Sequence, residues 1–463
     1  MKSIAQNNHQ DKVLANSIYR FFKEYHLSAL LKSVNAYKSK GIPAFAVFTV
    51  LFGAIFTQRS LYMGMLVNPS AYNLGKDTLY RFLNAAQINW LRFTSLLSAR
   101  IASKTIEPLT DEQRVNVLIV DDSMFSRGRS KKVELLAKVF DHAKGVYDLG
   151  FRLLTVCWSD GNTVLPVNSC LLSTANAKNR LNEATKMDRR TLGFKRRALA
   201  QTKAPEVMLH LLTAAKNAGI HAKHVLFDTW FCSPASLLSV KKIGYDVIAM
   251  AKKTSKVKYL YNGENLSAPE IYKRNRKRRG RSKYLLSVEV MVDKDGYESI
   301  PARLVYVRNR NKKSEYLVLV TTDMELDEKE MIRLYGKRWG IEVFFKFCKS
   351  YLKLSKECQG LSYDAMTAHV AIVFSRYMML SVENRLCVDE HSIGELFYLC
   401  TDEMADITWQ EGFQRLMQIL EELLTKNLDL SEKEVQIILD VFLANLPRIF
   451  SVSLDQTAEN IAI

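Results

Sequence analysis

The stretch Val115-Asn-Val-Leu-Ile-Val-Asp-Asp-Ser123 divides the chain, because helical patterns precede it and strand patterns follow it. Val115 to Val120 is a mostly β-branched apolar run, which is typical of a buried strand. Two carboxylates, Asp121 and Asp122, end this run, at the edge where open α/β sheets place their functional sites. A turn cap is the commoner role of a single strand-end aspartate, so this stretch alone does not establish a site.

Two apolar runs follow along the chain, at Leu149–Ser159 and Thr163–Ser173. The residues between them, Asp160-Gly-Asn162, include a glycine that tolerates positive φ, so we predict a β-hairpin. The next segment, Lys178–Lys203, is basic and reads as rich in loops.

A helix and two further strands complete this part of the pattern. Pro205 begins a predicted helix that Gly219 stops. Short apolar strands are expected at His224–Asp228 and Val247–Ala251, and the first of them ends in a carboxylate, as the strand before Asp121 does. A meander of strands followed by alternating strands and helices predicts a mixed α/β sheet.

The interval from Lys252 to about Leu326 is rich in strand patterns, including Arg303–Val307 and Tyr316–Thr321. It also carries Lys273-Arg-Asn-Arg-Lys-Arg-Arg-Gly-Arg-Ser-Lys283, in which 8 of 11 residues are basic. We expect a solvated loop here whose cations contact phosphates. The predicted DNA-binding residues of this loop are Lys273, Arg274, Arg276, Lys277, Arg278 and Arg279.

Helical patterns flank the strand-rich part on both sides. In residues 1 to about 110, Gly75-Lys-Asp-Thr78 reads as a turn and helix start. The helix that follows, with Lys76, Tyr80 and Arg81, fits the second helix of a helix-turn-helix and an ordinary amphipathic pair equally well. Near the other end, Leu416–Leu424 carries an apolar stripe that suits core packing or a dimer interface.

Charge and cysteine content limit the class of protein. Lys and Arg number 66 against 48 Asp and Glu, a net charge of +18, which favours a polyanionic partner such as DNA. The seven cysteines are odd in number and lack metal-ligand spacing, so free thiols in a reducing compartment are expected. Met1–Lys12 is polar and the longest apolar run, Ala44–Phe56, is too short to cross a bilayer. We therefore expect a cytosolic protein without membrane contact.

The most specific pattern is Tyr335-x2-Arg338-x3-Glu342-x6-Lys349. Within a predicted helix over Asp327–Leu352, these residues fall at roughly 0°, 300°, 340° and 320° around the axis, so they share one stripe. Lys346 lies beside them at about 20°. Arg338 and Glu342 also fit a surface ion pair four residues apart. One carboxylate among several cations suits a site that binds metal and phosphate together.

This pattern matches in full the signature helix of the insertion-sequence family four transposases. Val117-Leu-Ile-Val-Asp-Asp-Ser123 resembles the first catalytic strand of that family, and Val225-Leu-Phe-Asp-Thr-Trp-Phe231 resembles its second catalytic block. The resemblance implies an RNase H-like core interrupted by a β-strand insertion. On this basis we expect a helical DNA-binding domain over 1–110, a catalytic core over 111–252 and 327–360, an insertion over 253–326, and a helical region over 361–463.

The resemblance also implies the site. An Asp followed by Thr or Ser is the family's first metal ligand, which indicates Asp122 and not Asp121. Asp122, Asp228 and Glu342 would then be the catalytic carboxylates and would hold two Mg²⁺ ions, for which Mn²⁺ substitutes. Tyr335, Arg338, Lys346 and Lys349 would bind the phosphates of the DNA ends.

The expected function is a cut-and-paste transposase that binds terminal inverted repeats, cleaves the element ends and joins their 3′-hydroxyls to target DNA. Double-stranded DNA and a second copy of the chain are the expected partners, in a bacterial cytoplasm and on the nucleoid. A nuclease without strand transfer shares the metal site but does not need Tyr335 and Lys349. A non-catalytic DNA-binding derivative predicts a damaged triad, and a basic scaffold protein does not explain the strand-end acids.

Two tryptophans, Trp230 and Trp339, lie close to these acids in the sequence. Either ring could stack on an unpaired base near the cut, but core packing is the commoner role and is the prediction for both. The family places a base-capturing aromatic in the insertion, and its candidates are Tyr259, Tyr261, Tyr272 and Tyr284. His142 is expected to make a structural hydrogen bond.

Overall fold

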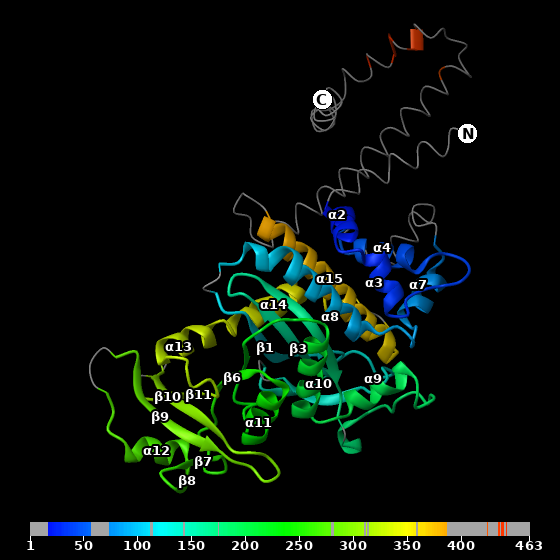
Figure 1. Ribbon diagram of the computed structural model, residues 1–463. Coiled ribbons are helices and arrows are strands. Elements are labelled where there is room, and N and C mark those ends of the chain that lie inside the picture. Colours follow the sequence, from blue (N-terminus) through cyan, green and yellow to red (C-terminus); the bar gives the residue numbers. More distant parts are fainter. Residues whose placement is uncertain are drawn as a thin grey trace.

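The computed structural model describes residues 17–56, 74–111, 114–141, 144–174, 176–278, 282–309, 314–357 and 360–386, together with a few single positions. At its centre is a mixed sheet of 11 strands in the order β2-β3-β1-β5-β6-β11-β10-β9-β7-β8, with β4 paired to β3 (Figure 1). The strands are β1 (Val117–Ser126), β2 (Ala137–Asp141), β3 (Val146–Ser159), β4 (Val164–Leu172), β5 (His224–Phe227), β6 (Asp246–Met250), β7 (Lys258–Tyr261), β8 (Glu264–Ser267), β9 (Tyr284–Val292), β10 (Ile300–Arg308) and β11 (Tyr316–Thr321).

Strand β1 is longer than the apolar run predicts. It continues past Val120 to Ser126, because β3 pairs with it antiparallel along its whole length, with Asp121 opposite Thr155. The prediction that the strand ends at the acids was therefore wrong: Asp121 and Asp122 lie inside the strand. Since successive strand residues face opposite sides of a sheet, their two side chains leave β1 in opposite directions.

The predicted hairpin between β3 and β4 is confirmed, and Gly161 in its turn has φ 99°. The following basic segment is rich in loops, as predicted, and also holds one α-helix. It contains α9 (Leu192–Ala200), which begins where the Thr191 side chain accepts a hydrogen bond from the backbone N–H of Phe194. Such a side-chain cap satisfies a backbone donor that the first turn of a helix leaves free.

The interval 253–326 is rich in strands, as predicted, and holds β7 to β11 with α12 (Ala268–Arg274). Its last strand, β11, pairs antiparallel with β6, so these strands continue the central sheet (Figure 1). Lys273 and Arg274 lie on α12 and not in a loop, which corrects the prediction for these two residues. Arg279 lies outside the described residues.

Helices surround the sheet. α14 contacts β1 and β4, α15 contacts α8 and α14, and α10 packs against β3 and β4 (Figure 1). The helices not yet given are α2 (Ser17–Glu24), α3 (Leu27–Ser33), α4 (Ala44–Gly53), α7 (Lys76–Leu83), α8 (Trp90–Ile101), α10 (Ala204–Asn217), α11 (Pro234–Ile243), α13 (Glu328–Gly336), α14 (Trp339–Ser350) and α15 (Tyr363–Leu386). The short helices are a π-helix, η1 (Ala102–Ile106), and two 3₁₀-helices, η2 (Glu107–Leu109) and η3 (Ala177–Asn179). The predicted α/β class with a large mixed sheet and flanking helices is confirmed, and it is consistent with an RNase H-like core.

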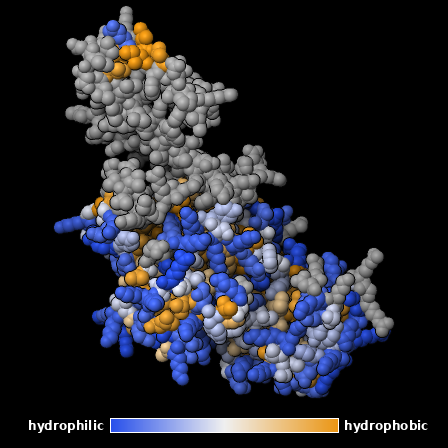
Figure 2. Space-filling model, turned by 180° about the vertical axis from the view of Figure 1, so that it is seen from behind, coloured by the Kyte–Doolittle hydropathy of each residue, from blue (hydrophilic) through white to orange (hydrophobic). Residues whose placement is uncertain are grey.

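Helix α15 is long and apolar enough to cross a membrane by length and composition, but 94% of its most apolar window is buried inside the protein. It also carries a buried arginine, Arg376, which donates to the carbonyl oxygens of Leu51 and Phe52 and pairs with Glu357 at 2.7 Å. These contacts are those of a core helix. On the face in Figure 2, apolar residues form small patches among hydrophilic ones. The described cysteines, Cys157, Cys170, Cys232 and Cys348, are free and buried.

Candidate active site

A single guanidinium joins a strand to a helix at the centre of the molecule. Arg338 Nη1 donates to Asp121 Oδ2 of β1 at 2.8 Å, and Arg338 Nη2 donates to Glu342 Oε1 of α14 at 2.6 Å. About two turns further along α14, Lys349 Nζ donates to Ser123 Oγ at 2.6 Å. Asp121 and Ser123 are two residues apart and therefore share one face of the strand. That face of β1 is the one that α14 covers.

The signature residues do not lie on one continuous helix, which corrects the prediction for Asp327–Leu352. α13 ends at Gly336 and α14 begins at Trp339. Between them the backbone N–H groups of Lys337, Arg338, Gly340 and Ile341 bond to carbonyl oxygens three residues earlier, at 3.0–3.2 Å. This tighter turn follows from two glycines, Gly336 and Gly340, which weaken an α-helix. Arg338 and Glu342 remain one turn apart.

Lys337 fixes this break to the sheet. Its Nζ donates to the carbonyl oxygen of Val115, just before β1, at 2.7 Å and to that of Asp160, in the β3–β4 turn, at 3.2 Å. Burial lowers the pKa of Lys337, and the Asp160 carboxylate opposes that shift. The start of α14 is thereby tied to the strand that carries Asp121. Sequence reasoning missed Lys337, although it lies within the signature.

Asp228 lies next to Asp121. It directly follows β5, which pairs parallel with β1 so that Leu226 is opposite Ile119. Two residues further along each strand, Asp228 is level with Asp121 and on the same side of the sheet. Burial raises the pKa of Asp121 to about 7; the Arg338 charge opposes this shift, and the Asp228 charge adds to it. Asp121 and Asp228 are therefore neighbours at this edge of the sheet, and Arg338 links Asp121 to Glu342.

Tyr335 belongs to the same neighbourhood. Burial raises its pKa to about 12, and the charges of Arg338 and Asp228 both act on its hydroxyl. The phenol is therefore neutral at physiological pH. Lys346, the remaining signature cation, is exposed on α14.

Asp122 lies on the opposite side of β1, apart from this group. Its two carboxylate oxygens accept hydrogen bonds from Arg152 Nε at 2.6 Å and Nη2 at 2.5 Å. The Arg152 guanidinium in turn lies 4.8 Å from the centre of the Trp230 ring. Of the two candidates for the first acid, the structure thus brings Asp121 together with Glu342, and Asp122 together with Arg152. The alternation of strand side chains was the signal that could have separated them.

The prediction of core packing for the two tryptophans is wrong. Trp230 is 50% exposed and Trp339 is 64% exposed. The backbone of Trp230 is restrained by Asp228, because the Trp230 N–H donates to Asp228 Oδ1 at 2.9 Å. Sequence position alone could not give this exposure, since it depends on what the rest of the fold covers.

The donor chemistry of the three acids fits a hard divalent cation, which takes carboxylate oxygens as ligands. Asp121 is a mostly covered carboxylate with Asp228 as a neighbour, and Arg338 pairs with both Asp121 and Glu342. Within the described residues, no three acidic, histidine or cysteine side chains are already close enough to form a metal cluster. Arg338 bonds to both Asp121 and Glu342.

The described residues of the basic stretch lie at the end of α12, just after it or just before β9, at the far end of the sheet from the acids (Figure 1). Arg274 pairs with Glu264 at 2.9 Å, Lys277 Nζ lies 4.6 Å from the centre of the Tyr272 ring, and Arg278 lies 4.3 Å from that of Tyr284. Among the other tyrosine candidates, Tyr259 is buried and Tyr261 donates to Asn275. Lys273 and Arg276 are exposed.

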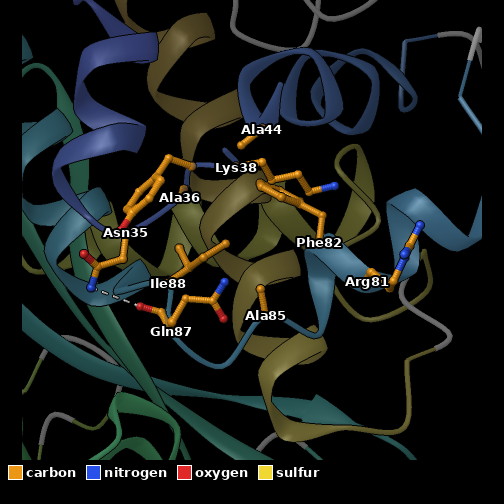
Figure 3. Close-up of a pocket in the computed structure, with 10 residues that line it drawn as sticks. Asn35, Ala36, Lys38, Ala44, Arg81, Phe82, Ala85, Gln87 and Ile88 are labelled. Carbon is orange, nitrogen blue, oxygen red and sulfur yellow. Dashed lines mark hydrogen bonds between the residues drawn. The ribbon is translucent and has the colours of Figure 1, made fainter. Parts of the chain in front are cut away.

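A small hollow of about 130 Å³ lies in the N-terminal helical region, beside α7 (Figure 3). Lys38 and Arg81 are among the side chains that line it. The predicted helix-turn-helix is not decided by this arrangement, because residues 57–73 before α7 lie outside the described residues. His142 and most of the Leu416–Leu424 stripe also lie outside them.

Comparison with protein families identifies the class to which this arrangement belongs. The sequence profile of a family described as DDE superfamily endonuclease matches residues 51–297, which is more than half of the chain. The protein therefore belongs to the DDE superfamily endonucleases, whose substrate is DNA and which generally use divalent metals. The match includes Asp121, Asp122 and Asp228, whereas Glu342 lies beyond it. A search of curated proteins finds no match to this chain.

Proposed function

We propose that the protein is an insertion-sequence transposase that cleaves the ends of its element and joins the 3′-hydroxyls to target DNA, with Asp121, Asp228 and Glu342 as its catalytic carboxylates. The observation that carries the proposal is the Asp121–Arg338–Glu342 bridge, beside which Asp228 lies. Asp121 replaces Asp122 as the first acid because only Asp121 faces α14.

The three carboxylates are proposed to hold two Mg²⁺ ions, with Mn²⁺ as a substitute. Bound Mg²⁺ would lower the pKa of an attacking water or 3′-hydroxyl and stabilise the leaving oxygen. Hard cations of this kind bind few protein carboxylates and leave positions for phosphate oxygens. Asp121, Asp228 and Glu342 would supply such a set.

The chain's own residues prepare the site for phosphate. The Arg338 charge balances those of Asp121 and Glu342, and its planar set of N–H donors suits phosphate as well as carboxylate. Lys349 fixes α14 to β1 through Ser123, while Lys346 on the same helix is exposed to a DNA backbone. The neutral Tyr335 hydroxyl can donate a hydrogen bond without adding charge.

The wider assembly follows from the reaction. Joining two ends at one target needs two active sites, so we propose a dimer on paired terminal repeats. The net charge of +18 and the basic stretch with Lys273, Arg274 and Arg276 support contact with the DNA flanks. The domain division given above is part of the same proposal, as is action in a bacterial cytoplasm.

The test is cleavage of labelled DNA that carries the repeats flanking the gene, with Mg²⁺ and with Ca²⁺. We expect cleavage and joined products with Mg²⁺ alone, and loss of both in Glu342→Ala with DNA binding nearly intact. Glu206→Ala is the matched control, since Glu206 also lies in the first turn of a helix, α10, and is exposed. Retained cleavage in Glu342→Ala contradicts the site, and cleavage without joined products favours a nuclease.

A further inference from the structure

The side of β1 opposite to the acids carries a layered arrangement of three side chains. Asp122 holds Arg152 by two hydrogen bonds, and the Arg152 guanidinium lies under the Trp230 ring. Arg152 and Asp122 are mostly covered, with side-chain exposures of 17% and 12%, whereas Trp230 is 50% exposed. The outermost layer of a buried ion pair is thus an aromatic ring open to solvent.

This arrangement fixes the ring before any ligand arrives. Two parallel hydrogen bonds to Asp122 hold the Arg152 guanidinium in one plane, and this cation attracts the face of the Trp230 ring. The bond from the Trp230 N–H to Asp228 restrains the backbone of the same residue. Lys252 adds a second cation, because its Nζ donates to the carbonyl oxygen of Trp230 at 3.4 Å.

An exposed and preorganised tryptophan, with a paired arginine under its ring and Lys252 beside its backbone, suits an unpaired nucleotide. Aromatic faces stack with any nucleobase, and nearby cations attract the phosphates that flank it. A folded protein gains nothing in stability from leaving half of a large ring in water. Although the ring lies on the other side of β1, the Trp230 N–H bonds to Asp228 Oδ1 at 2.9 Å, so the ring borders the edge of the sheet at which Asp228 lies.

We propose that Trp230, supported by Arg152 and Asp122, is a stacking site for an unpaired base of the DNA strand at the cleavage point. The inference rests on the proposed function, because the acids beside Trp230 must be the place of cleavage. Asp122 is in this view a positioning residue: it orients Arg152 and, through it, the ring.

The direct test uses a single-stranded oligothymidylate with one central 2-aminopurine, bound in Ca²⁺ so that the DNA stays uncut. Stacking quenches the fluorescence of 2-aminopurine. We expect quenching by the unaltered chain, little quenching by Trp230→Ala, and single-strand affinity lower by roughly 5- to 150-fold, the usual loss per stacked base. Trp230→Phe should retain most of the quenching, because a smaller aromatic face remains.

The matched control is Tyr147→Ala, which removes an aromatic ring that is 72% exposed on the same strand as Arg152. Binding of a fully paired duplex of the same length serves as the second control. Trp230→Ala should leave duplex binding within about twofold and Tyr147→Ala should change neither probe. Equal loss on single-stranded and duplex DNA, or unchanged quenching in Trp230→Ala, would overturn the stacking site.

The two proposals fail in different ways. If the unaltered chain neither cuts nor joins terminal-repeat DNA in Mg²⁺, the proposed function fails, whatever the quenching result. If the unaltered chain cuts and joins but Trp230→Ala quenches 2-aminopurine as strongly, only the stacking site fails. Asp122→Asn gives an independent measure, since it should weaken quenching through Arg152 while Trp230 itself is kept.

Discussion

Asp121 and Asp122 are neighbours in one strand, yet each belongs to a different cluster. Both pair with an arginine, but Arg338 has a second carboxylate, Glu342, as its other partner, whereas Arg152 has an aromatic ring, Trp230. The first arrangement gathers negative charge that needs a cation. The second neutralises its charge internally and presents a hydrophobic face. The pleat of one strand thus separates two kinds of binding chemistry by a single residue.

The largest difference in cleavage is expected when the charge is removed on each side of β1 in turn. Asp121→Asn should lower Mg²⁺-dependent cleavage by on the order of 10²–10³-fold or more, because a charge that acts on the reacting groups is lost. Asp122→Asn should cost less than about tenfold, since an amide still accepts from Arg152. The measurement is the rate of strand cleavage on terminal-repeat DNA under single-turnover conditions.

Equal losses of cleavage rate in the two variants, or a larger loss in Asp122→Asn, would contradict Asp121 as the first catalytic carboxylate and favour Asp122. DNA binding in Ca²⁺ is the control for both variants, because neither substitution removes a cation. Asp188→Asn, at an exposed carboxylate that pairs with Arg190, should leave the rate unchanged.

Substitution of Arg338 and Arg152 should have smaller effects that also differ between the two sides of β1. Lysine keeps the charge of arginine but cannot bridge two partners with a planar fork. Arg338→Lys should therefore reduce cleavage by about tenfold, because Asp121 and Glu342 lose their common partner. Arg152→Lys should leave cleavage of duplex ends within a few-fold and instead weaken the quenching of single-stranded 2-aminopurine. A cleavage defect in Arg152→Lys as large as that in Arg338→Lys would mean that the two faces work as one site.

Much of this arrangement could be predicted from the sequence, and the limits have physical causes. The apolar run before Asp121, the strand before Asp228 and the acid of α14 are local patterns, so the three elements were found. The side of β1 on which each acid lies depends on how far β3 pairs along it, which no local pattern gives. The helix break between Gly336 and Gly340 and the exposure of Trp230 depend in the same way on neighbours distant in sequence.

The two glycines of the break test whether the position of α14 against the sheet matters. A Cβ on Gly340 would lie 2.7 Å from Val164 Cγ2 of β4, whereas one on Gly336 would meet nothing within 4 Å. Val164 is β-branched and yields little at χ1, so Gly340→Ala should move α14 and lower cleavage a few-fold, with about 1 kcal/mol lost in stability. Gly336→Ala should be neutral or stabilise by about 0.4–1 kcal/mol. Cleavage rates and thermal unfolding of the pair check this, and similar effects at both positions would contradict it.

A third arginine cluster, inside the protein, gives the smallest expected effect on cleavage and shows what a purely structural network does. His369 of α15 lies beside Glu357 and Arg376, and its Nε2 is 2.8 Å from the carbonyl oxygen of Leu354. Burial lowers the pKa of His369 from 6.5 to about 4, an effect that the Glu357 charge opposes and the Arg376 charge reinforces. The folded chain therefore keeps this imidazole neutral at a pH where the unfolded chain protonates it.

The sign of the pH dependence follows from that difference. Between about pH 6.5 and about pH 4 the unfolded state binds more protons, so the free energy of unfolding falls as the pH drops through this window and its slope relaxes below it. His369→Gln keeps a donor for the Leu354 carbonyl oxygen but does not titrate. The thermal unfolding midpoint of this variant should therefore fall less steeply as the pH drops over the same range. Cleavage at pH 7 should be unchanged, because His369 is neutral there and touches neither face of β1. If the stability of His369→Gln still falls steeply between pH 6.5 and about pH 4, another titrating group is responsible. A cleavage defect at pH 7 would mean that α15 affects the active site.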